Sequence, residues 1–69
     1  MTVETLIGRL TLEQSRLDER LEVCDYEYLN ALRYGNQNLV RICELKAQDI
    51  LIEKEEIDIA LRVIKKRVA

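Results

Sequence analysis

The chain has 69 residues, of which 48% are hydrophobic and 35% charged, and it contains two glycines and no proline. This composition is typical of one small domain with little loop. Eleven basic and thirteen acidic residues give a net charge of −2, which favours neither nucleic acid nor an anionic membrane as a partner. The chain has no histidine, tryptophan or phenylalanine, so it lacks many of the side chains used in catalysis and metal binding. We expect no enzymatic activity, cofactor, metal or small-molecule substrate.

Signals for membranes and secretion are missing from the sequence. The first residues show no basic stretch followed by an apolar run, and no apolar run approaches the roughly 20 residues that span a bilayer. Secreted domains of this size usually carry two to four disulfides, whereas this chain has only Cys24 and Cys43. We therefore predict a cytoplasmic protein, without membrane contact, in which both thiols are reduced.

Apolar residues recur every three and four residues through the first half of the chain, as at the a and d positions of a heptad repeat. Eight of the nine positions are apolar, and Gln14 is the exception. The spacing predicts an amphipathic helix over about residues 3–33, with Glu4 in its first turn. Gly8 lies inside this helix and suggests a close contact with another helix. The nine positions are Val3, Ile7, Leu10, Gln14, Leu17, Leu21, Cys24, Tyr28 and Ala31.

Glycine and asparagine cluster only around residues 34–38, where the repeat stops. Gly35 can adopt the left-handed conformation that ends a helix, and either Asn36 or Asn38 can cap the next helix. A connection this short joins antiparallel neighbours. We predict a turn over residues 34–38.

The same repeat resumes after the turn and predicts a second helix over about residues 39–67, with Lys54 as its one polar seam position. The fold predicted is therefore all-α: residues 1–69 form a single domain, an antiparallel, coiled-coil-like hairpin of two helices. The nine seam positions of the second helix are Val40, Cys43, Ala47, Ile50, Lys54, Ile57, Leu61, Ile64 and Val68.

The second helix is apolar on more than its seam. A helix that is hydrophobic on two sides is normally buried on two sides, and a chain this short gains stability from further burial. We predict that this second stripe packs on another copy of the chain, giving a homodimeric four-helix bundle, or receives helices from a different protein. Its members are Ile42, Leu45, Ile52, Ile59 and Val63, and Leu51 widens it.

The two tyrosines nearest the turn outside the seam, Tyr26 and Tyr34, are candidates for a secondary interface. Both lie near arginines, and exposed Tyr and Arg are enriched in binding hot spots. The alternative is that they simply cover the loop.

Gln14 and Lys54 are the candidates for setting the register of the hairpin, because a shifted pairing would bury either one without a partner. With the turn near residue 36, facing positions sum to roughly 72. This puts Gln14 level with Ile57 and Asp58, and Lys54 level with Leu17 and Asp18. Alternatively, the stem of Lys54 covers the seam while its ammonium group reaches water, or Asp18 and Glu22. The same arithmetic separates Cys24 from Cys43 by more than one helical turn, which argues against a disulfide.

These features favour a non-enzymatic protein that self-associates and binds another protein through apolar helix faces, as an adaptor, chaperone or inhibitor. In size and layout the chain is similar to several kinds of small helical hairpin, including plasmid-type RNA-binding dimers and co-chaperones of secretion-needle subunits. One alternative is a nucleic-acid-binding four-helix dimer that uses the basic cluster at the end of the second helix, although the acidic composition disfavours it. A purely structural oligomerisation module is the other. The basic cluster comprises Arg62, Lys65, Lys66 and Arg67.

Overall fold

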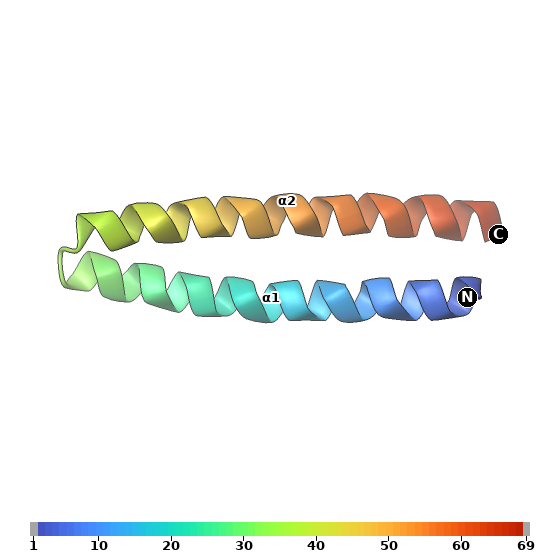
Figure 1. Cartoon of the computed structure of the whole chain (residues 1–69), viewed down its shortest axis with the longest axis horizontal. Coiled ribbons are helices and arrows are strands. Elements are labelled where there is room, and N and C mark those ends of the chain that lie inside the picture. The colour runs from blue at the N-terminus through green and yellow to red at the C-terminus, as the bar shows by residue number, and fades with distance from the viewer. Residues whose placement is uncertain (1, 69) are drawn as a thin grey trace.

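Two long helices make up the described part of the chain, residues 2–68, in the computed structural model. Helix α1 spans Val3–Arg33 and helix α2 spans Gln37–Val68. They run antiparallel and side by side, so both chain ends lie at the same end of a rod of 50 × 16 × 14 Å (Figure 1). The predicted all-helical hairpin is confirmed.

The first helix begins and ends with standard capping contacts. The Thr2 hydroxyl accepts a hydrogen bond from the Thr5 amide at 3.1 Å, which satisfies one of the free N–H groups of the first turn. At the other end the Asn36 amide donates to the Ala31 carbonyl at 2.9 Å, and the Gly35 amide donates to the Leu32 carbonyl at 3.2 Å. This pair of bonds is a Schellman motif, and it requires the positive φ of +69° that Gly35 adopts.

The second helix begins at Gln37, two residues before the start predicted from the sequence. Asn36 caps it, because its side-chain oxygen accepts a hydrogen bond from the Leu39 amide at 3.2 Å. Asn36 therefore both closes the Schellman motif of α1 and caps α2, which shortens the turn to residues 34–36.

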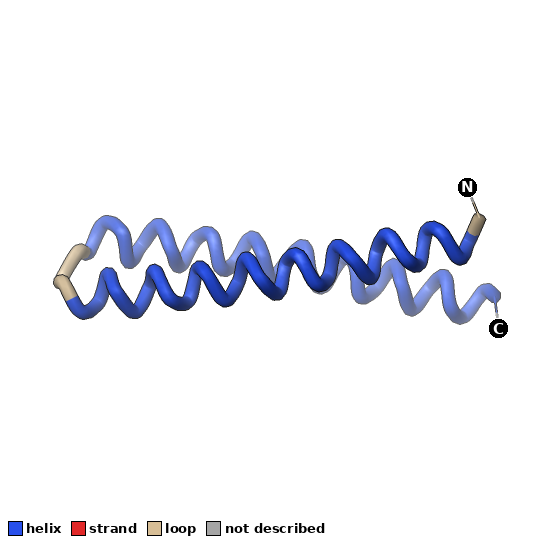
Figure 2. The backbone as a smooth tube through the Cα atoms, turned by 90° about the horizontal axis from the view of Figure 1, so that it is seen from below, coloured by secondary structure: helices blue, strands red, loops and turns tan. Residues whose placement is uncertain are grey.

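The core is a single seam between the helices. Within residues 2–68 seven side chains are buried, and every one of them occupies an a or d position of the heptad repeat. The helices cross in one view and lie side by side in the other, so they wind around each other and keep these positions in contact (Figure 2). The seam opens at the chain ends, where Val3 and Val68 are 45% and 62% exposed. The buried residues are Leu17, Cys24, Ala31, Val40, Cys43, Ile50 and Leu61.

Gly8 makes no close helix contact, contrary to the expectation from sequence. A Cβ atom at this position would meet nothing within 4 Å, because Gly8 lies on the exposed side of α1. Neither of the two helices, over residues 2–68, has a stretch apolar enough to cross a bilayer.

Candidate interaction surface

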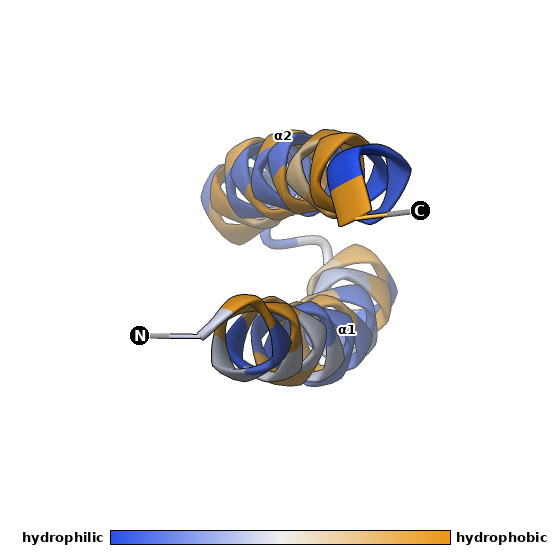
Figure 3. Ribbon diagram, turned by 90° about the vertical axis from the view of Figure 1, so that its right-hand side faces the viewer, coloured by the Kyte–Doolittle hydropathy of each residue, from blue (hydrophilic) through white to orange (hydrophobic). Residues whose placement is uncertain are grey.

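The outer apolar face of α2 is left uncovered by the hairpin. Its members lie mainly at the c and f positions of the repeat, which point away from the a and d positions that contact α1. Hydrophobic residues accordingly appear on the far side of α2 as well as between the helices (Figure 3). We call this surface the outer stripe; its members, each between 46% and 57% exposed, are Ile42, Leu45, Leu51, Ile52, Ile59 and Val63.

Charged residues in the second half of α2 fall into two blocks. Residues 49–58 hold five carboxylates and one lysine, whereas residues 62–67 hold four basic side chains and no acidic one. Among residues 2–68, Asp49, Glu53, Glu55 and Glu56 form no ion pair, so these carboxylates face solvent without a basic partner. The outer stripe therefore runs from an acidic segment into a basic one.

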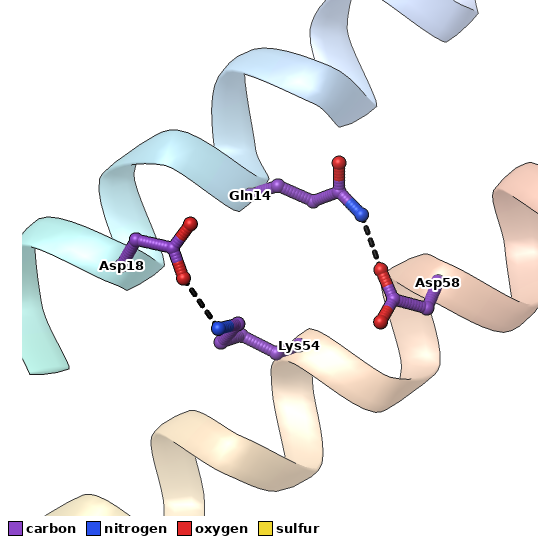
Figure 4. Close-up of polar contacts among 4 residues, drawn as sticks. All are labelled: Gln14, Asp18, Lys54 and Asp58. Atoms are coloured by element: carbon purple, nitrogen blue, oxygen red, sulfur yellow. Dashed lines mark hydrogen bonds and ion pairs between the residues drawn. The ribbon is translucent and has the colours of Figure 1, made fainter.

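A polar layer crosses the seam near its middle (Figure 4). The Gln14 side-chain amide donates to Asp58, and the Lys54 ammonium group forms an ion pair with Asp18. In both pairs the residue numbers sum to 72, the value expected for this hairpin. The hydrogen bond with Asp18 raises the pKa of Lys54 above its ordinary value of 10.5. That these contacts select the register is still a prediction.

The two cysteines lie in the middle of the core as free thiols. The Cys24 thiol donates a hydrogen bond to the Cys43 carbonyl at 3.1 Å. Carbonyl groups of a helix point toward residue i+4, so the Cys43 oxygen lies toward Ala47, which is about level with Cys24 in this register. Burial, and secondarily the neighbouring Cys43, raises the pKa of Cys24, which keeps the thiol protonated and poorly nucleophilic.

The tyrosines predicted near the turn are strongly exposed, with Tyr26 at 68% and Tyr34 at 79%. Leu29 and Leu32 of α1 are also exposed, at 63% and 49%, and the sequence reasoning missed them. They occupy b and e positions, so a count of apolar residues outside the seam would have found them. Apolar exposure near the turn thus involves both helices.

Shallow grooves run along the seam on both sides of Cys24. One has a volume of about 510 Å³ and is bordered mainly by charged side chains, including Glu19, Arg20 and Lys46. The other, of about 340 Å³, is bordered by Tyr28 and by Leu51 of the outer stripe. Both are open channels between helices, a shape that suits the edge of another helix better than an enclosed small molecule.

Metal-ligating side chains do not converge within residues 2–68, where no three Cys, Asp or Glu residues are arranged to hold an ion. Comparisons of the chain with known protein families, curated proteins and solved structures found no match.

Proposed function

We propose that this chain is a non-enzymatic helical hairpin that self-associates through the outer stripe and binds another protein through the apolar surface left near the turn. The proposal depends on one observation: every buried side chain in the described part of the chain belongs to the α1–α2 seam, while the six residues of the outer stripe keep 46–57% of their surface exposed. Exposed apolar area of this extent on one helix marks an association surface in soluble proteins.

The mode of partner binding that fits this surface is helix packing. A partner's amphipathic helix would lay its apolar side along α2 or along a groove beside the seam, with side chains inserted at three- and four-residue intervals. Such a complex would hold the partner's helix away from its usual contacts. This is the behaviour of an adaptor, chaperone or inhibitor.

Sedimentation equilibrium over a wide concentration range tests the self-association. We expect a mass of twice the chain that dissociates on dilution. The double substitution Ile52→Glu and Ile59→Glu should give a monomer with unchanged helical circular dichroism, because both side chains are outside the seam. The matched control is Leu12→Glu, since Leu12 is a 53% exposed residue of α1 and should leave the dimer intact.

Two outcomes would contradict the proposal. A wild-type chain that stays monomeric at every concentration would rule out self-association. A double variant that remains a dimer would show that the outer stripe is not the interface.

The basic end of α2 supports a second candidate, a nucleic-acid-binding hairpin. Arg62, Lys65, Lys66 and Arg67 are all exposed at the end of the rod where the chain termini lie. Binding of a labelled RNA hairpin that weakens steeply between low and moderate salt would support this candidate, because phosphate contacts release counterions. Apolar helix packing lacks that dependence. A chain that dimerises but captures neither kind of partner would be an oligomerisation module.

A further inference from the structure

The charges beside the outer stripe constrain how two copies can meet, given the self-association proposed above. Ile52 lies within the acidic segment 49–58, Ile59 follows it, and Val63 lies within the basic segment 62–67. All three are about half exposed. Any helix that covers them therefore contacts both charge blocks at once.

Parallel pairing of two α2 helices is unfavourable. With a twofold axis along the helices, each residue faces its own copy, so Asp49 meets Asp49 and Glu56 meets Glu56 within the stripe. The two basic segments also meet, and like charges in contact weaken association. If the two parallel helices were shifted, the acidic segment of one copy would meet the basic segment of the other at one place only. The remaining acidic and basic segments would stay free at the two ends, so further copies would add and form open chains.

Antiparallel, staggered pairing brings the acidic segment of each copy onto the basic segment of the other, in one closed dimer. We propose that the partner on the outer stripe is a second copy of this chain, packed antiparallel so that the basic segment 62–67 of each copy lies on the acidic segment 49–58 of the other. With Ile52 level with Val63 of the second copy, facing positions sum to about 115. Asp49 then faces Lys66 of the second copy, and Glu55 lies beside Arg62 at the flank.

Because the dimer has a twofold axis, each of these contacts occurs twice. Residues 47–68 of the two copies overlap, about 33 Å of helix and about three heptads, which is the length over which a heptad seam becomes specific. Asp49 and Glu55, which form no ion pair within residues 2–68, thereby gain basic partners, whereas Glu56 faces Ile59 of the second copy.

The arrangement has a definite shape. Because the outer stripe is opposite the seam, the four helices form a row in the order α1, α2, α2, α1, with the two α2 helices in the centre. The stagger leaves Ile42 and Leu45 uncovered in the turn-proximal half of α2, and α1 exposes Leu29 and Tyr26 in the same half of the hairpin. That half of each hairpin remains available to the other protein.

A charge-exchange experiment tests the arrangement, using the full chain and sedimentation equilibrium. Glu55→Arg alone and Arg62→Glu alone should each raise the dimer dissociation constant by about tenfold or more, because each creates two like-charge contacts. The double variant Glu55→Arg with Arg62→Glu should regain near wild-type affinity. An equal mixture of the two single variants should form heterodimers, which native mass spectrometry resolves from homodimers.

Glu22→Arg is the matched control, because Glu22 is an exposed carboxylate of α1 that lies outside the proposed interface. Its dimer should be unchanged, and circular dichroism should show that all variants keep their helices. If the wild type dimerises but neither the double variant nor the mixture recovers affinity, the staggered arrangement is wrong and self-association stands. If the wild type is a monomer, the proposed self-association itself is wrong.

Discussion

Replacing Gly8 by alanine measures the helix preference of a single position in α1, because nothing in the hairpin touches it. Gly8 is exposed within a continuous helix, and an added Cβ would meet no atom within 4 Å. Alanine is favoured over glycine in a helix interior by about 0.8–1.0 kcal/mol. We expect the free energy of unfolding to rise by about 1 kcal/mol and the melting temperature by about 4–8 °C, as is usual for domains of 60–100 residues.

Thermal and urea unfolding followed by far-ultraviolet circular dichroism measure this change. The urea midpoint should rise by roughly 0.3–1 M for the m-values of small proteins. Wild type and variant are compared at several equal concentrations, because self-association makes the melting temperature depend on concentration. An unchanged or lower melting temperature would refute the reasoning, and a simultaneous loss of dimer mass would mean that a second chain packs against Gly8.

The matched control is alanine at the other glycine, where the effect should have the opposite sign. A Cβ at Gly35 also meets nothing within 4 Å, but Gly35 has a φ of +69°. A side chain in this left-handed conformation costs about 1–2 kcal/mol. Since neither site adds packing, the two substitutions differ only in backbone conformation, and shifts in the same direction would contradict the explanation.

Three further outcomes follow from the core and its polar layer. Lys54→Leu should raise the melting temperature while broadening the distribution of oligomers in size-exclusion chromatography, because it replaces an ion-paired seam residue by an apolar one; a lower melting temperature would contradict the seam assignment. Because Asp18 raises the pKa of Lys54, the stabilisation from this pair is complete below pH 10.5 and is lost as the pH rises through the folded-state pKa. In alkaline unfolding the wild type should therefore lose more stability than Lys54→Met, and equal losses would disprove the link. Cys24 and Cys43 should react with Ellman's reagent only at the rate at which the hairpin opens, since both are buried; an immediate reaction in the native state would contradict that burial.

The hairpin and its contacts were predictable because a heptad repeat carries geometric information. Seam positions recur with the helical period, so the repeat marked the side of each helix that the other covers, and all seven buried side chains fall on it. The position of Gly35 then fixed which residues face each other. The sum of facing positions therefore placed Gln14 beside Ile57 and Asp58 and Lys54 beside Leu17 and Asp18, and in each case the structure shows contact with the aspartate.

The helix cap, the surroundings of Gly8 and the hydrogen bond of Cys24 depend on local atomic positions, and the sequence did not predict them. Asn36 and Asn38 are equally suitable caps by residue type, and only the backbone path of the Schellman motif decides for Asn36. A glycine in a helix has no signature that separates a close contact from open solvent, so Gly8 was misjudged. The hydrogen bond from the Cys24 thiol to the Cys43 carbonyl likewise depends on side-chain packing across the seam, which the heptad repeat does not specify.

The two faces of α2 share a pattern that bears on its role. Each face is an apolar stripe interrupted by charged residues, Lys54 on the inner side and Asp49 and Glu56 on the outer side. On the inner side the interruption has its partner in Asp18. A charge placed in an apolar stripe discriminates among pairings when a partner supplies the opposite charge, and otherwise only weakens association. Within residues 2–68 the outer carboxylates have no ion-pair partner, so a partner that neutralises them must come from outside the hairpin. In the staggered dimer the basic segment of a second copy supplies that charge to Asp49 through Lys66. This is why we favour self-association over the nucleic-acid alternative, which would leave the acidic segment unpaired.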